Sequence, residues 1–298
     1  MQTIQSRATQ RGLFYVVTAS TLWGTTGVVS QLLAHLAHTN GLSIGTLRLT
    51  VAAPILLLTA WQLLGRKIWS VSWRDVGVMV LMGVMIAINQ ALYFVAISFS
   101  NVTVATLVTI CSAPILVLIL TAVIERKMPS RFTISIIFLA LLGTVLLVGS
   151  SATQTQSASS LIGVACALGS SCAYTGVLLL SKFLSGKYHS LQINAVGFSV
   201  GAICLLVVSH LVGFAGNYPV TGWMLILYLG AIPTALAYGL FTFGMRTTSA
   251  PTASMIILLE PLTAAVLASL LFGERLTLVG IGGVALLLGA IYALSRSE

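Results

Sequence analysis

Ten long apolar stretches run through this sequence, and they constrain its fold more than any other feature. Each is close to the about 20 residues that an α-helix needs to cross the hydrocarbon core of a bilayer. Membrane β-barrels show alternating segments of about ten residues instead. The stretches are residues 12–34, 42–64, 74–97, 102–123, 131–149, 160–184, 190–213, 222–244, 251–271 and 276–295. We therefore expect an all-α polytopic membrane protein with ten transmembrane helices.

Charged residues are too few to cover a soluble protein of this length. Only 6% of the 298 residues are charged, against about 25% in soluble domains. This composition excludes an ordinary soluble enzyme and a disordered chain. The net charge of +9 does not indicate nucleic-acid binding, because the basic residues stand singly or in pairs between apolar runs rather than in one patch. The cysteines and histidines show no metal-ligand spacing, so we expect no metal and no cofactor.

The basic residues predict the orientation in the membrane, because Lys and Arg concentrate in cytoplasmic loops. With the N-terminus inside, twelve of the fourteen fall on inner segments, whereas the outer loops carry only Arg275 and Arg48 lies within a helix. This bias predicts an even number of helices with both termini in the cytoplasm.

The two halves of the chain resemble each other weakly. Trp23 lies eight residues before Gln31, and Tyr174 lies eight residues before Lys182. Near the end of the halves, Tyr93 leads to Ala113-Pro114 and then Glu125-Arg126, as Tyr238 leads to Glu260-Pro261 and then Glu274-Arg275. The two prolines are 147 residues apart.

Five helices per half is an odd number, so the second copy must enter the membrane with the opposite orientation. We therefore expect two inverted five-helix repeats, residues 1–150 and 151–298. Inverted repeats are a recurrent construction of secondary transporters, with the substrate site near the midplane between the halves.

Several short strings resemble the EamA units of the drug/metabolite transporter superfamily. They are Leu22-Trp23-Gly24, Arg48-Leu49, Ala113-Pro114, Leu259-Glu260-Pro261 and Gly273-Glu274-Arg275-Leu276. Within the superfamily, the chain is most similar to the bacterial YddG-type exporters of aromatic and other amino acids, which are also linked to paraquat export. The resemblance implies a permease of the bacterial inner membrane with a central cavity. One departure is that Glu125 in the first repeat has no preceding glycine.

Two ionisable residues fall at membrane depth, where charges are costly and are functional candidates. Glu260 lies about halfway along its helix and Arg48 several residues inside the outer end of another. Glu260 could bind an ammonium group, carry a coupling proton, or bond backbone groups freed by Pro261. Arg48 could bind a carboxylate, reach to the interface, or pair with Glu260.

Polar and aromatic residues of the apolar stretches are candidates to line the substrate site. An aromatic cage with amide and hydroxyl groups suits amino-acid side chains, and also a planar dication. A membrane Trp or Tyr belongs as readily to the interfacial belt, above all Tyr93. The candidates beside the two charges are Trp23, Asn89, Gln90, Tyr93, Thr109, Ser112, Tyr174 and Tyr238.

Four prolines lie inside predicted helices, where they free backbone groups and permit kinks. They are Pro54, Pro114, Pro233 and Pro261. Each is either a gating element or a static bend.

The sequence thus favours a secondary transporter that exports amino acids and related metabolites by alternating access at a central cavity. A multidrug or cation exporter is the alternative, and a membrane-embedded enzyme or a channel is a more remote one. The expected partners are a small-molecule substrate and the lipid bilayer, with no nucleic acid. A monomer and a homodimer are both open.

Overall fold

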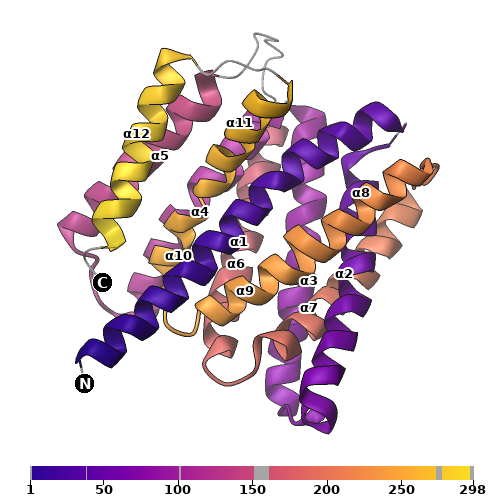
Figure 1. Cartoon of the computed structure of the whole chain (residues 1–298), viewed down its shortest axis with the longest axis horizontal. Helices are drawn as coiled ribbons and strands as arrows, with labels where there is room; N and C mark the ends of the chain where they lie inside the picture. Colours follow the sequence, from indigo (N-terminus) through magenta and orange to yellow (C-terminus); the bar gives the residue numbers. More distant parts are fainter. Residues whose placement is uncertain (1, 38, 101, 151–160, 273–276, 296–298) are drawn as a thin grey trace.

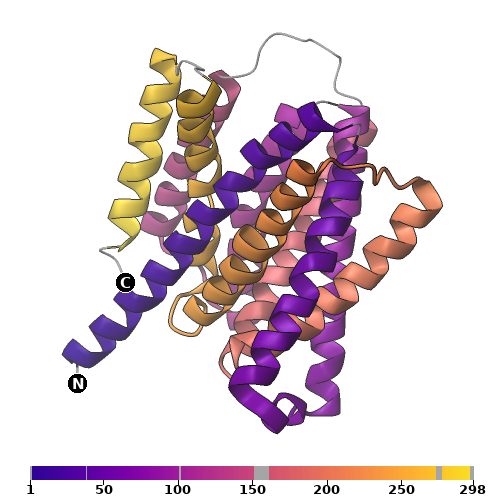
Figure 2. The ribbon, with the colours of Figure 1, turned by 45° about the vertical axis from the view of Figure 1, so that its right-hand side comes forward.

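The computed structural model describes residues 2–37, 39–100, 102–150, 161–272 and 277–295. In these residues the chain forms helices and short turns, and no strand occurs among them. Figures 1 and 2 show a bundle in which α1 begins and α12 ends on the same side. The all-α prediction is confirmed for this part of the chain.

The helices follow the predicted apolar stretches closely. The first half holds α1 (Gln2–Leu36), α2 (Gly41–Leu64), the 3-10 turn η1 (Gly65–Trp69), α3 (Trp73–Phe99), α4 (Val102–Glu125) and α5 (Arg131–Ser150). The second half holds α6 (Leu161–Ser185), α7 (Ser190–Val212), α8 (Val220–Gly230), η2 (Ala231–Leu236), α9 (Ala237–Gly244), α10 (Ala250–Ile256), α11 (Leu259–Phe272) and α12 (Leu278–Ser295). Only α1 begins much earlier than expected, because polar residues that favour helices extend it beyond the apolar stretch.

Nine helical segments among the described residues are long and apolar enough to span a membrane. In that count, α8 to α9 form one segment and α10 to α11 another. The tenth predicted stretch is also an apolar helix, but its apolar part, Leu278–Ala293, is shorter. A tenth crossing therefore stays a prediction.

Pro233 lies in a π-helical turn, η2, that interrupts the helix from α8 to α9. Proline has no N–H, so the carbonyl four residues earlier loses its helical donor. That carbonyl belongs to Leu229, and the Thr234 hydroxyl donates to it at 2.7 Å instead. The regular α-helix is therefore interrupted just before Tyr238, and the Leu229 carbonyl still has a hydrogen-bond donor.

Pro261 accompanies a second interruption, between α10 and α11. Ile257 and Leu258 form a turn there, and the backbone N–H of Glu260 donates to the Ile257 carbonyl at 2.8 Å. In a regular helix the N–H of residue 261 would donate to this carbonyl, but proline has no N–H. By contrast, Pro54 and Pro114 lie within the uninterrupted helices α2 and α4.

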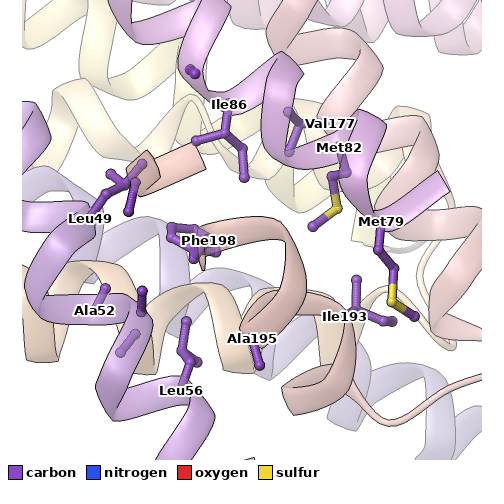
Figure 3. Packing of buried hydrophobic residues seen from close by; sticks show 14 of the residues in the cluster. Leu49, Ala52, Leu56, Met79, Met82, Ile86, Val177, Ile193, Ala195 and Phe198 are labelled. Atoms are coloured by element: carbon purple, nitrogen blue, oxygen red, sulfur yellow. The ribbon is translucent and has the colours of Figure 1, made fainter. Parts of the chain in front are cut away.

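Helices from the two halves pack against each other throughout the bundle. α3 lies along α6, α2 along α7 and α5 along α12, while α1 crosses α9 and α11. The α5–α12 pair lies at one edge of the bundle (Figure 1). An apolar core fills the space where α2, α3 and α7 meet, and its buried side chains include Leu49, Leu56, Met79, Met82, Ile86, Ile193 and Phe198 (Figure 3).

Large apolar side chains also cover the outside of the bundle. Phe138, Leu211 and Leu270 expose 69%, 79% and 75% of their surface. Soluble monomers rarely expose large contiguous apolar patches. The exposed side chains are therefore those of a multi-pass protein whose surface meets lipid.

Candidate functional site

Glu260 lies in the first turn of α11, directly after the helix interruption. Its side chain is half-buried, and it forms no ion pair or hydrogen bond with any residue that the structure describes. The helix α1 sets its position, because a Cβ on Gly24 would lie 2.7 Å from the Glu260 carbonyl oxygen and 2.5 Å from Thr263 Cβ. Only glycine in the Leu22-Trp23-Gly24 string permits this close approach.

Arg48 lies about two turns after the start of α2 and is half-buried as well. A similar glycine contact sets its position: a Cβ on Gly230 would lie 3.1 Å from the Arg48 carbonyl oxygen and 2.5 Å from Val51 Cβ. The Nε atom of Arg48 is buried, and it has no hydrogen-bond partner in the described part of the chain. A buried guanidinium donor without a partner is costly unless a bound group satisfies it.

The two charges lie near each other without forming an ion pair. Glu260 and Arg48 interact electrostatically, and Arg48 also interacts with Tyr238. Yet no carboxylate oxygen of Glu260 lies within 4.0 Å of an Arg48 nitrogen. Of the readings left open for Arg48, a direct ion pair with Glu260 is therefore absent from this conformation. Two groups of opposite charge type therefore lie near each other and are not in direct contact.

A group of aromatic rings includes Tyr238, which interacts electrostatically with both charges. Trp23 packs against Tyr238 and Phe241, with ring centroids 4.7 and 5.1 Å apart, and Phe198 lies 4.7 Å from Tyr238 on another side. Trp23 is buried, and its Nε1 donor has no partner among the described residues. The indole N–H is thus a second donor available to a bound molecule.

Tyr93, Tyr174 and Tyr238 all lie close enough to Glu260 to interact with it electrostatically. The structure therefore brings six of the ten predicted site residues into one neighbourhood, on α1, α2, α3, α6, α9 and α11: Trp23, Arg48, Tyr93, Tyr174, Tyr238 and Glu260. We call these six residues the charged-aromatic cluster.

Two predicted site residues are held in contacts between helices. The side-chain amide of Asn89 donates to the Ser170 hydroxyl at 2.9 Å and to the Ser170 backbone carbonyl at 3.1 Å. The Ser170 hydroxyl donates in return to the Asn89 backbone carbonyl at 2.9 Å. Thr109 donates to the Ala167 carbonyl at 3.2 Å. These bonds join α6 to α3 and to α4, which is a positioning role. The Tyr93 hydroxyl likewise lies 2.7 Å from Thr106 Oγ1 on α4.

Gln90 and Ser112 are half-buried, and no hydrogen bond fixes their side chains within the described residues. Gln90 faces α2, since its Nε2 would lie 3.9 Å from a Cβ on Gly45. Sequence reasoning missed Phe198 and Phe241, which flank the two central rings. Phe241 follows Tyr238 by three residues and so shares its helix face, which was an available signal. Phe198 had none.

Comparison with known proteins agrees with this architecture. YwfM of Bacillus subtilis, an uncharacterized transporter, is 30% identical over 283 residues, which cover 95% of this chain and 93% of that protein. YicL of Salmonella typhimurium, an uncharacterized inner membrane transporter, is 27% identical over 296 residues, covering 97% and 96%.

A crystal structure of another protein matches 98% of this chain and 99% of its own with a TM-score of 0.79, at 17% identity, and so shows a shared fold. The model of the EamA-like transporter family matches residues 10–149 and, a second time, residues 161–296. The chain therefore belongs to the EamA-like transporter family, in the drug/metabolite transporter superfamily.

Proposed function

We propose that this transporter exports neutral amino acids, aromatic ones included, and related metabolites by binding their zwitterionic end between Arg48 and Glu260. The observation that carries the proposal is the pair of opposite charges, mutually close but not in contact, with neither side chain hydrogen-bonded to the described protein. An α-amino acid presents a carboxylate and an ammonium group on one carbon. The guanidinium would take the first, and the Glu260 carboxylate would take the second.

The aromatic rings of the charged-aromatic cluster support the same substrate class. Trp23 packs against Tyr238, and Tyr238 interacts with both charges. Rings of this kind pack against aliphatic and aromatic side chains alike. A phosphorylated metabolite would need several cationic groups, whereas this cluster contains one arginine. The site therefore fits a neutral amino acid better than a phosphorylated or nucleotide-linked metabolite.

We further propose that residues 1–150 and 151–298 are inverted copies that exchange conformations to open the site to each side in turn. Matching glycine contacts support this. A Cβ on Gly83 would meet the Gly197 carbonyl oxygen and Val200, as one on Gly230 would meet the Arg48 carbonyl oxygen and Val51. In each case the two contacted residues are three apart, and the contacting glycines are 147 apart, like Pro114 and Pro261.

The contact between α5 and α12 supports the same symmetry. A Cβ on Gly143 would lie 2.7 Å from the Gly283 carbonyl oxygen, and one on Gly283 would lie 2.6 Å from the Gly143 carbonyl oxygen. Such a reciprocal contact is expected where two equivalent helices cross on a two-fold axis. The family model matches residues 10–149 and again residues 161–296, which supports a division of the chain between these two matches.

The proposed setting is the bacterial inner membrane, with ten crossings and both termini in the cytoplasm. The bias of Lys and Arg toward one set of loops supports this orientation. The start of α1 and the end of α12 lie on one side of the bundle (Figure 2), as an even count requires. One chain supplies both charges of the site, so a monomer suffices for binding.

A cation exporter is the second candidate, because Glu260 and the neighbouring rings would attract a planar dication. Arg48 opposes it, since a cation bound at Glu260 would meet the guanidinium at short range. The proposal therefore ranks zwitterions above dications.

The test is counterflow in proteoliposomes that are loaded with unlabelled amino acids. Labelled phenylalanine, threonine or methionine outside should accumulate transiently above equilibrium. Paraquat in parallel vesicles tests the second candidate. Absence of counterflow for all three amino acids with folded protein would overturn the amino-acid assignment, whereas flux without saturation or counterflow would indicate a channel.

Analogues that lack one charge then test the roles of the two residues. An amino-acid amide lacks the carboxylate, and an N-acetyl amino acid lacks the ammonium group. Each should compete about 10–100-fold less well than the parent, the loss expected for one charged hydrogen-bonded pair. Arg48→Met should abolish only the penalty of the amide, and Glu260→Gln only that of the N-acetyl compound. Arg11→Met, on an exposed part of α1, is the matched control.

A further inference from the structure

Lys182, near the end of α6, clamps two turns of the second half together. Its Nζ donates to the carbonyls of Met245 at 2.7 Å and Thr248 at 2.6 Å, both in the turn between α9 and α10. Arg246 in that turn donates in return to the Ser185 and Tyr188 carbonyls, each at 3.1 Å. We call these four hydrogen bonds the Lys182 clamp, and the end of the bundle that contains them the Lys182 end.

Gln31 is the counterpart of Lys182 in the first half. Each lies eight residues after the corresponding aromatic residue, Trp23 or Tyr174. The turns that follow also correspond, because Asn40 caps α2 and His189 caps α7, each with its side chain. If the halves are inverted, Gln31 approaches the turn between α3 and α4 at the opposite end of the bundle.

Among the residues that the structure describes, the clamp has no formed counterpart at that opposite end. Gln31 is exposed, and its side chain makes no hydrogen bond within the described residues. α6 packs against α9 and α10, whereas the corresponding packing of α1 against α3 and α4 is marginal at most in the part of the chain that the structure covers. The two ends of the described bundle therefore differ in this clamp, which is formed at the Lys182 end and is not made by Gln31 at the other end.

Another pair of contacts is present at both ends. The Tyr188 hydroxyl donates to Asp75 at 2.7 Å, and at the other end the hydroxyls of Thr39 and Tyr218 are hydrogen-bonded. Tyr188 and Thr39 correspond, since each precedes the residue that caps the next helix. A contact found at both ends does not distinguish two states related by exchanging the halves. The Lys182 clamp does distinguish them, because within the described part of the chain it is formed at one end and not at the other.

We propose that the Lys182 clamp is the latch of one gate, and that in the alternate state it opens while the Gln31 amide binds the carbonyls at the end of α3. This inference rests on the alternating exchange of inverted halves proposed above. The two latches differ in strength, because an ammonium donor makes stronger hydrogen bonds than an amide. The difference biases the protein without substrate toward the state closed at the Lys182 end.

Two pairs of spin labels can follow the gates, in a variant without the four native cysteines. Gly186 and Phe243 report the Lys182 end, and His35 and Ser98 report the Gln31 end; all four are exposed. The pairs are counterparts, since His35 and Gly186 each lie twelve residues after Trp23 or Tyr174, and Ser98 and Phe243 each lie five after Tyr93 or Tyr238. Exchange of states should therefore shorten one distance and lengthen the other.

The protein without substrate should show mainly the short Gly186–Phe243 distance. Lys182→Met should shift the populations at least about tenfold toward the exchanged distances, because two charge-assisted hydrogen bonds are lost. Gln31→Lys should shift them in the same direction with the clamp left intact, and Lys182→Arg should shift them less than Lys182→Met. Tyr188→Phe removes the hydrogen bond to Asp75, a contact that we expect in both states because its counterpart is formed at the other end. It is the control that should leave the populations unchanged.

Unchanged populations in both Lys182→Met and Gln31→Lys would overturn the latch, as would a lengthening of both distances, which indicates a loosened bundle. These readings need no substrate, so they separate the latch from the transported compound. Amino-acid counterflow without any population shift would reject the latch alone. A clear shift in a protein that carries no amino acid would reject the substrate alone.

Discussion

The crossing of α5 and α12 gives the most direct test of the packing described here. Gly143 and Gly283 meet backbone to backbone, so a methyl group on either would lie 2.6–2.7 Å from the carbonyl oxygen of the other. On the same helix, Gly282 has no atom within 4 Å of the place where its Cβ would be. Gly283→Ala and Gly282→Ala therefore add the same methyl group at neighbouring positions, one in close contact with α5 and the other in open space.

The geometry gives the size of the effect. Ordinary contact begins at 3.4 Å, so a methyl group at 2.7 Å requires the helices to move apart by the difference, about 0.7 Å. Overpacking of this kind costs about 1–3 kcal/mol, whereas alanine in a helix is favoured over glycine by about 1 kcal/mol. We expect Gly282→Ala to be neutral or stabilising. The Gly283→Ala variant should be less stable than the Gly282→Ala variant by the whole cost of overpacking, about 1–3 kcal/mol. Gly143→Ala should behave like Gly283→Ala.

Thermal unfolding of the purified protein in one detergent measures this difference. The double variant Gly143→Ala with Gly283→Ala adds a second check, because one separation of the helices relieves both clashes. Its loss of stability should therefore be smaller than the sum of the single losses. Equal melting temperatures for Gly282→Ala and Gly283→Ala, or strict additivity in the double variant, would refute the contact as described.

Three further predictions concern the site and one helix cap. Gly24→Ala should reduce transport strongly while the protein remains in the membrane, because the methyl group displaces the helix that carries Glu260; Gly27→Ala, with open space around it, should transport normally. If Glu260 carries a coupling proton, Glu260→Gln should lose pH-driven uptake and keep exchange, and equal rates in both assays would exclude that role. Burial and a nearby arginine hold the pKa of His189 below its ordinary value of 6.5, so stability should fall as pH drops below about 6.5, where the unfolded chain binds the proton more readily. His189→Asn, which copies the Asn40 cap, should lower this slope in pH-dependent melting.

The helices could be predicted from the sequence because a bilayer accepts few alternatives to long apolar helices. The interruptions could not be placed in the same way. Four prolines look alike in the sequence, yet only Pro233 and Pro261 accompany breaks. The difference lies in local hydrogen bonds, made by the Thr234 hydroxyl and the Glu260 N–H, and hydropathy carries no information about them.

The candidate site was predictable in its charged and aromatic members, because a charge at membrane depth requires a reason. The role of Asn89 was not, because its partner Ser170 lies 81 residues away and an amide serves a ligand and a neighbouring helix equally well. The distance between Arg48 and Glu260 likewise depends on two glycine contacts, one between α1 and α11 and the other between α8 and α2. Single glycines in apolar helices are too common to reveal such contacts beforehand.

If the two halves are inverted copies, as proposed, the positions of the two charges have a consequence for how a substrate binds. By the glycine contacts, Gly197 is the counterpart of Arg48, and by the paired prolines, Ala113 is the counterpart of Glu260. In a dimer of identical five-helix units, every charge would appear twice around the axis, and a bound molecule would meet the same groups in either direction. One chain with two diverged halves holds each charge once. The proposed site therefore has a direction, and we expect a molecule with two different ends to fit it in one orientation only.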